Sequence, residues 1–335
     1  MLPNIPNADI VPFYDDTRLK RVQLATQTKP SGGGLTVVPL PPTGLLRGVQ
    51  IYITLTVTGT PDAANALGIC SAIRAIRLRT NASTNIYEAS GADFVYGINE
   101  MLGTEAFVGI SSTYNQGASA VAAGTFRLDH YLPVAMNWRD PVGLFLLQNR
   151  EINVNLEIEW EADTVVTGGA TATYTASAVP VMEFFTLPSN DKAMPDLSLV
   201  HQISTEQRIV SGSGVVQYEP PTGQIYLGMA YGTYWAQSAA DSWSRFEEIV
   251  GASDYWMNET TGLMDGLNSL SRGRNRRAGT IIRDYMASAG LGMMSTTDRD
   301  AFDTLLTTNY IHRFTLTGAG TLRIVKRQLV RVGSN

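Results

Sequence analysis

The chain of 335 residues has a formal net charge of −5, and only 16% of its residues are charged. This length favours two units of roughly 150 residues each, and the acidic balance argues against a protein that coats nucleic acid, so we expect no direct sequence-specific nucleic-acid binding. The single cysteine, Cys70, excludes an internal disulfide framework, and its apolar surroundings predict a small buried residue. Low charge is typical of a surface that is largely covered by copies of the same chain.

The N-terminal segment, residues 1–16, carries scattered apolar side chains without a basic start or a long apolar centre, so it does not have the pattern of a signal peptide. Its larger apolar residues are Leu2, Ile5, Ile10, Val11 and Phe13. We expect either a terminal arm or a disordered start. No apolar run in the chain approaches about 20 residues, so no membrane-spanning segment is predicted.

Three strands and one helix are predicted next. Residues 35–40, 49–57 and 73–79 are predicted strands. The second alternates between apolar and polar side chains, and the third has a basic outer face. Helical spacing follows in residues 90–103, where Ser90 is placed to cap the first turn. The predicted apolar stripe of this helix is Phe94, Ile98, Met101 and Leu102. We expect it to lie on a sheet edge.

Residues 152–160 are the clearest predicted strand, because their side chains alternate regularly. The apolar face is Ile152, Val154, Leu156, Ile158 and Trp160, and the polar face is Asn153, Asn155, Glu157 and Glu159. This is the period of a sheet that is buried on one side only. Glu157 and Glu159 could serve as the carboxylate pair of a glycoside hydrolase, but we expect them to line the solvated or interface-forming face of the sheet.

A boundary between two halves is predicted near residue 190. Residues 187–199 concentrate proline, asparagine and aspartate, which break ladders and favour turns. The sequence Pro-Pro-Thr-Gly at 41–44, before a predicted strand, returns at 220–223 before the strand-like residues 224–234. We therefore predict an arm over residues 1–16, a first sandwich over 17–190 and a second over 191–335.

The second half is predicted to hold more helix, with candidates at 241–250, 260–270 and 298–307. It closes with a strand whose inner face is Leu322, Ile324, Val330 and Val332 and whose outer face is Arg323, Arg327 and Arg331. Strand-rich halves with excursions between their strands fit a mainly β fold of two tandem eight-stranded jelly rolls, with short helices and long loops inserted, better than an immunoglobulin fold.

Catalytic and metal-binding motifs are not found. None of the three histidines, His130, His201 and His312, lies within metal-ligand spacing of another. HExxH, CxxC, Walker and GxSxG patterns are missing as well. We predict no catalytic residue, no metal, no cofactor and no enzymatic activity.

The one dense basic cluster is Arg272, Arg274, Arg276 and Arg277, with Arg283 nearby. Guanidinium groups bind carboxylate and phosphate equally well, so the cluster could contact a neighbouring subunit, anionic lipid headgroups or nucleic acid. A solvated loop is the alternative. Of the contacts, we favour the one with a neighbouring subunit.

The segment before the 152–160 strand carries a recognisable order of residues. These are Leu132-Pro133, Arg139-Asp140-Pro141, Gly143-Leu144 and Leu147-Gln148-Asn149. This order resembles a signature of the double jelly-roll major capsid proteins of tailless icosahedral double-stranded DNA viruses. No equally convincing copy of it occurs in the second half.

The resemblance implies two eight-stranded jelly rolls side by side, a homotrimer with a nearly hexagonal outline, and an icosahedral virion shell assembled in the host cytoplasm. It also implies contacts with neighbouring capsomers, with penton and minor capsid proteins and with the lipids of an internal membrane. By position, the arm residues Leu2, Ile5, Ile10, Val11 and Phe13 would lie near that membrane. Two other classes stay open, a receptor- or glycan-binding β-sandwich and a jelly-roll glycoside hydrolase.

Overall fold

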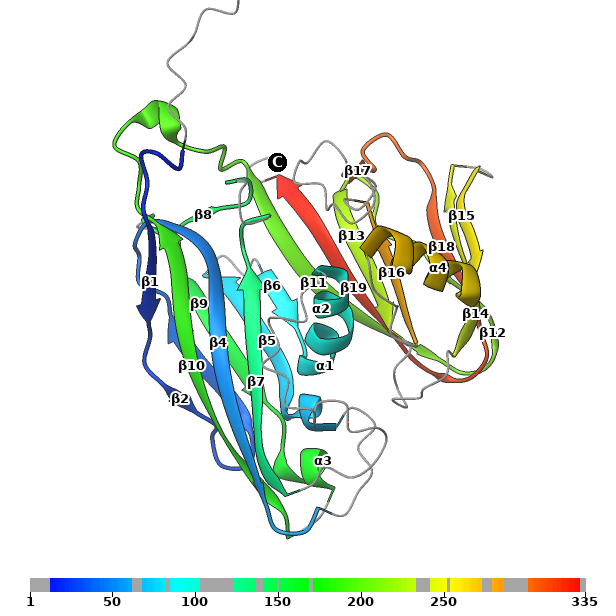
Figure 1. Cartoon of the computed structure of the whole chain (residues 1–335), viewed down its shortest axis with the longest axis horizontal. Helices are drawn as coiled ribbons and strands as arrows, with labels where there is room; N and C mark the ends of the chain where they lie inside the picture. Colours follow the sequence, from blue (N-terminus) through cyan, green and yellow to red (C-terminus); the bar gives the residue numbers. More distant parts are fainter. Residues whose placement is uncertain are drawn as a thin grey trace, which may run out of the picture.

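The structure is a computed structural model, and it describes residues 13–61, 68–81, 85–102, 123–136, 141–149, 151–168, 171–232, 242–251, 254–272, 279–285 and 301–331. These residues form two β-sandwiches that stand side by side (Figure 1). Figure 1 places strand β1 (Leu19–Gln23) at one outer margin of the molecule and β15 (Asp254–Thr260) at the other.

The first sandwich has eight principal strands among the described residues. In chain order they are β1, β3 (Gly34–Pro39), β4 (Leu45–Thr58), β5 (Ile73–Thr80), β6 (Asn85–Ala89), β7 (Gly124–Pro133), β9 (Val154–Trp160) and β10 (Thr173–Phe185). One sheet has the order β1-β10-β4-β7 and the facing strands have the order β3-β9-β5-β6. Short strands β2 (Gln27–Thr28) and β8 (Phe145–Leu146) pair with β10 and β4.

The second sandwich repeats this pairing order. Its principal strands are β11 (Leu199–Val210), β12 (Gly214–Tyr218), β13 (Ile225–Gly232), β14 (Trp243–Val250), β15, β16 (Thr280–Asp284), β18 (Tyr310–Leu316) and β19 (Gly320–Arg331), with a short β17 (Phe302–Asp303) beside β13. They form β11-β19-β13-β16 and β12-β18-β14-β15. When the eight principal strands of each half are counted in chain order, the first, eighth, third and sixth share one sheet among the described residues. The second, seventh, fourth and fifth share the other. The predicted tandem of eight-stranded jelly rolls is confirmed.

Short helices occupy equivalent places in the two halves. Between the fifth and sixth strands lie α1 (Gly91–Asp93), the π-helical η2 (Phe94–Ile98) and α2 (Asn99–Leu102) in the first half, and α4 (Thr261–Arg272) in the second. Ser90 caps α1 as predicted, because its hydroxyl accepts the amide of Asp93 at 3.1 Å. The predicted helix at 260–270 is confirmed by α4, in which Met264 is buried and Leu263 is exposed.

Other short helices lie outside these insertions, namely η1 (Gly68–Ala72), α3 (Asp163–Thr167) and η5 (Asp191–Ala193). The predicted strands at 35–40, 49–57, 73–79, 152–160 and 224–234 correspond to β3, β4, β5, β9 and β13. Along β9 buried and half-buried residues alternate, as the sequence predicts.

Two of the predicted helices are wrong. Residues 241–250 contain strand β14, whose register shifts twice, once against β18 and once against β15. These irregularities break the two-residue period, so its buried side chains fall at a spacing that imitates a helix. The described part of 298–307 holds β17 and a turn, in which Leu306 is almost fully exposed.

The core is divided between the sandwiches, and β19 contributes to both parts. Leu322 and Ile324 belong to the core of the second sandwich, while Val325 packs into that of the first. The predicted outer position of Arg327 is therefore wrong, since this side chain is only 4% exposed, and Val330, predicted inside, is half-buried. A strand covered on both faces does not show the single-face alternation from which these positions were predicted.

Candidate functional site

The joint between the two jelly rolls is the best-defined contact surface of the described residues. Strand β11 lies parallel to the outer edge of β6, with Ile203 paired to Tyr87, so the two sandwiches share one continuous sheet. Beside this pair, the side-chain amide of Gln202 donates a hydrogen bond to the backbone carbonyl oxygen of Asn85, 2.5 Å away. Edge-to-edge pairing of this kind satisfies backbone groups that an edge strand otherwise leaves open.

Polar side chains reinforce the joint. Arg323 on β19 donates to the carboxylate of Asp93 at 3.1 Å. Elsewhere along the joint, buried Arg327 donates to the ring of His201 at 3.0 Å and to the carbonyl oxygen of Met136 at 2.5 Å. Burial lowers the pKa of His201 well below its usual value, and the charge of Arg327 lowers it further, so the ring is a neutral acceptor.

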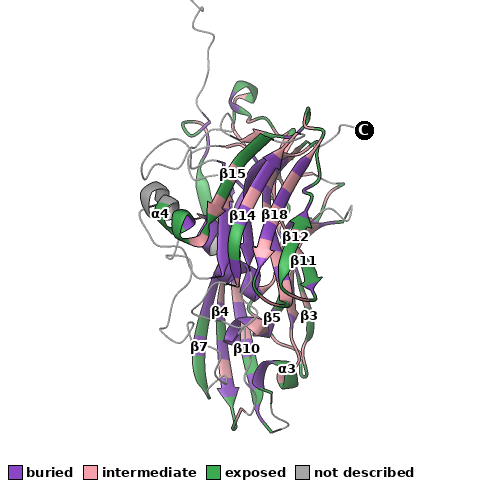
Figure 2. Ribbon diagram, turned by 90° about the vertical axis from the view of Figure 1, so that its right-hand side faces the viewer, coloured by how far each residue is buried: buried purple, intermediate pink, exposed green. Residues whose placement is uncertain are grey.

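The two outer edges of the molecule are open. Among the described residues, β1 pairs only with β10 and β15 pairs only with β14. Every residue of β1 is exposed, and most of β15 is exposed as well, as the green ribbon of β15 in Figure 2 shows. The large apolar side chains here are Leu19 (43% exposed), Val22 (40%), Tyr255 (48%) and Trp256 (45%). Exposed apolar edges are typical of surfaces that pair with another chain.

The most enzyme-like group of side chains surrounds Glu248 inside the second jelly roll. Its carboxylate accepts hydrogen bonds from Arg283 at 2.5 Å, Tyr285 at 2.7 Å and Tyr310 at 3.0 Å, and His312 lies 3.5 Å away. Burial raises the pKa of Glu248, but the hydrogen bond with His312 and the charges around it outweigh burial and lower the pKa to about 2. The carboxylate and the imidazole are fully buried, so the arrangement is a satisfied structural network. Sequence reasoning missed it because 241–250 was predicted as a helix.

The carboxylates weighed as a glycosidase pair lie on the half-buried face of β9. Glu159 is engaged by Arg74 at 3.3 Å and by Arg77 at 2.9 Å, and Arg77 also binds Glu88 at 2.8 Å. This carboxylate is therefore held in a surface ion-pair network that includes two arginines. Glu157 and Glu159 are both half-buried, and their placement on a solvated or interface-forming face stays a prediction.

Of the other predicted site residues, the structure describes only a few. Phe13 is buried against Phe185 in a small core that includes Leu45. The arm residues Leu2, Ile5, Ile10 and Val11 and the arginines Arg274, Arg276 and Arg277 lie outside the described residues, and Arg272 is the last residue of α4. Arg283 is not part of a surface cluster, because it is paired with Glu248. Cys70 is buried, as predicted.

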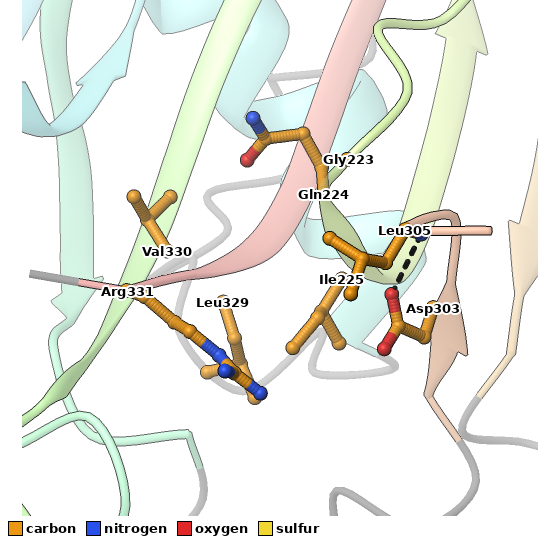
Figure 3. Close-up of a pocket in the computed structure, with 8 residues that line it drawn as sticks. All are labelled: Gly223, Gln224, Ile225, Asp303, Leu305, Leu329, Val330 and Arg331. Carbon is orange, nitrogen blue, oxygen red and sulfur yellow. Dashed lines mark hydrogen bonds between the residues drawn. The ribbon is translucent and has the colours of Figure 1, made fainter. Parts of the chain in front are cut away.

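Two cavities among the described residues lack convergent catalytic groups. One of about 230 Å³ lies between β13, β17 and β19, and Figure 3 shows Arg331, Ile225 and Leu329 around it, with Asp303 accepting the amide of Leu305 at 2.8 Å. Another, of about 330 Å³, lies at the joint and includes Glu161 among its lining residues. Within the described residues each lining holds one carboxylate and no histidine.

Within the described ranges, no group of three or more histidine, cysteine, aspartate or glutamate residues is placed to hold a metal ion. No helix in those ranges combines the length and the apolar character needed to cross a membrane.

No model of a known protein family matches the chain, and no curated protein matches it. Solved structures do match over nearly the whole length. The MCP of STIV (Sulfolobus Turreted Icosahedral Virus) has a TM-score of 0.69 at 12% identity and covers 94% of this chain and 97% of its own. The PBCV-1 virus capsid protein has a TM-score of 0.64 at 9% identity, with 95% of each chain covered. The major capsid protein P2 from bacteriophage PM2 has a TM-score of 0.55 at 13% identity and covers 95% and 99%. The chain therefore has the double jelly-roll fold of these major capsid proteins.

Proposed function

We propose that the chain is a structural major capsid protein, whose homotrimers form pseudo-hexameric capsomers that tile an icosahedral shell. The observation that carries this proposal is the exact repeat of strand order in two adjacent jelly rolls, with an open edge at each outer margin. Three such chains would present six similar sandwiches around one axis. Symmetric closure of this kind requires complementary surfaces on different sides of one chain.

The similar structures from STIV, PBCV-1 and PM2 are capsid proteins, and this supports the same role here. A charged fraction of only 16% suits a protein that buries much of its surface against its own copies. The division into jelly rolls at 17–190 and 191–335 is part of the proposal, and it places the boundary between β10 and β11.

The proposed partners are further capsomers, penton and minor capsid proteins, and the lipids of an internal membrane beneath the shell. Residues 1–16 would form the arm nearest to that membrane, with Phe13 as its anchor in the first jelly roll. The role is mechanical, without catalytic turnover. The virion is the proposed location, after assembly in the host cytoplasm.

Light scattering on the purified chain tests the proposal. We expect a stable trimer near three times 36.3 kDa that associates further into facets or shells visible by electron microscopy. A strict monomer that binds a glycan would overturn the proposal in favour of a glycan-binding sandwich. Sugar cleavage that is lost on Glu157→Gln or Glu159→Gln would favour a hydrolase.

A further inference from the structure

The two jelly rolls have the same strand order, so the contact between them inside one chain can serve as a template for a contact between two copies of the chain. Inside the chain, the fifth strand of the first jelly roll, β6, lies beside the first strand of the second, β11. The counterpart of β6 in the second jelly roll is β15, and the counterpart of β11 in the first is β1. Within the described residues, each of these two counterparts pairs with a neighbour on one side only and so has an open outer edge, as do the edge strands β3, β7, β12 and β16.

The fifth strands, β6 and β15, can be aligned residue by residue, because each has a register shift against its neighbouring strand. Between β5 and β6 the register shifts after the pair Leu78–Tyr87. Between β14 and β15 it shifts at the same place in the ladder, after the pair Glu248–Met257. Met257 is therefore the counterpart of Tyr87.

The first strands are aligned in the same way through their neighbours. In the first jelly roll the register between β10 and β4 shifts next to Glu183, and β1 places Arg21 opposite Glu183. In the second, the register between β19 and β13 shifts next to Arg327, and β11 places Ile203 opposite Arg327. Arg21 is therefore the counterpart of Ile203.

We propose that β1 of one copy lies parallel to β15 of the next copy, with Arg21 beside Met257, as Ile203 lies beside Tyr87 inside the chain. This assignment rests on the proposed function and gives it a specific surface. The contact is head-to-tail, so repeated copies close into a ring when the rotation between them fits.

The chemistry of the two edges is complementary. β1 carries Lys20 and Arg21, of which Arg21 is already paired with Glu183 at 2.7 Å, whereas β15 carries Asp254 and Glu259. Opposite charges on the two edges would favour the approach of β1 of one copy to β15 of the next.

Apolar side chains accompany these charges. Leu19 and Val22 on one edge and Tyr255 and Trp256 on the other are exposed in the single chain. By contrast, Tyr87 and Ile203, at the equivalent contact inside the chain, are buried. Partly exposed aromatic and aliphatic residues between rims of opposite charge are the composition expected of an interface.

Engineered disulfides test the register. The double variant R21C/M257C places cysteines on neighbouring strands about 4.8 Å apart, within the span that a disulfide bridges. We expect oxidation to give a ladder on a non-reducing gel that ends at three copies. A second double variant, Q23C/E259C, lies two residues further along both strands and should cross-link in the same way. Neither single variant should form the ladder.

A matched control uses two other exposed edge strands, β3 and β12, in the double variant V37C/V215C. It should not cross-link above background, and Cys70 is present in all variants alike. If light scattering shows a trimer but both predicted pairs fail to cross-link, or the control pair cross-links equally, the surface assignment is overturned while the proposed function stands. A chain that stays monomeric at every concentration overturns both.

Discussion

Arg323 of the second jelly roll donates a hydrogen bond to the carboxylate of Asp93 in the first, across 3.1 Å. The same carboxylate accepts the hydroxyl of Ser90 at 2.6 Å and completes the capping box of α1. The Asp93 side chain is 1% exposed and that of Arg323 is 14% exposed, so this ion pair is largely shielded from water. One buried acid therefore starts a helix and joins the two sandwiches.

Asp93→Ala should strongly destabilise the fold, because it leaves a shielded guanidinium without its carboxylate and removes the Asp93 half of the capping box of α1. Loss of one partner of a buried pair costs about 3–5 kcal/mol. Chemical denaturation at a fixed protein concentration measures the change in the free energy of unfolding. Arg208→Ala, which breaks the exposed pair with Glu206, should cost at most about 1 kcal/mol. Equal effects of the two variants would contradict this reading of the joint.

The repeated Pro-Pro-Thr-Gly segments provide a matched pair of glycines. Gly44 and Gly223 both have positive φ, at 64° and 80°, where an L side chain is strained. A Cβ at Gly44 would also clash with the carbonyl oxygen of Phe185, whereas at Gly223 it would meet nothing within 4 Å. Gly223→Ala should cost about 1 kcal/mol, and Gly44→Ala at least twice that. Thermal unfolding of both variants distinguishes them, and a smaller effect at Gly44 would refute the clash.

Lowering the pH should reduce the free energy of unfolding of the chain, because His130 is buried in the first jelly roll. Burial lowers the pKa of this side chain from 6.5 to about 3. The centroid of its ring lies 4.1 Å from the centroid of the Phe94 ring. Below pH 6.5 the unfolded chain binds a proton that the folded chain excludes, so His130 lowers the free energy of unfolding by about 1.4 kcal/mol per pH unit until pH 3. His130→Leu should reduce that slope. An unchanged slope between pH 6 and pH 4, measured by denaturant titration, would reject the role of His130.

The basic cluster after α4 is expected to act in assembly. The triple variant R274A/R276A/R277A should weaken particle formation while leaving the thermal unfolding of the isolated chain unchanged, because guanidinium groups bind acidic surfaces of a neighbouring subunit. Electron microscopy and light scattering follow assembly. The control is R74A/R127A/R208A, which removes the same charge from three exposed positions. Assembly that proceeds as in the unmodified chain would dismiss the cluster as a solvated loop.

Strands with one buried face were predictable because their side chains carry the two-residue period directly. β9 shows this along its whole length, and β4 shows it from Val49 to Thr58, with buried residues at alternate positions. The cap of α1 was equally visible, since the Ser90 hydroxyl acts within one helical turn. These features depend only on neighbours in the sequence.

Positions shaped by distant strands could not be read in this way. β14 imitates a helix because two register irregularities, each set by a different partner strand, interrupt its alternation. Arg327 is buried because β19 faces both jelly rolls and His201 from β11 accepts its hydrogen bond. The network around Glu248 brings together side chains from β14, β16 and β18, which are separated along the chain.

The sequence by itself determined the fold class of this protein, a tandem of two β-sandwiches, because the side-chain period reports directly on burial. Only the tertiary structure decided which edges are closed and which remain open. Pairing between β6 and β11 is a contact between strands more than a hundred residues apart, and no local pattern encodes it. Strand edges are satisfied by whichever backbone the fold brings beside them, so the open edges of β1 and β15 emerge only when both jelly rolls are assembled.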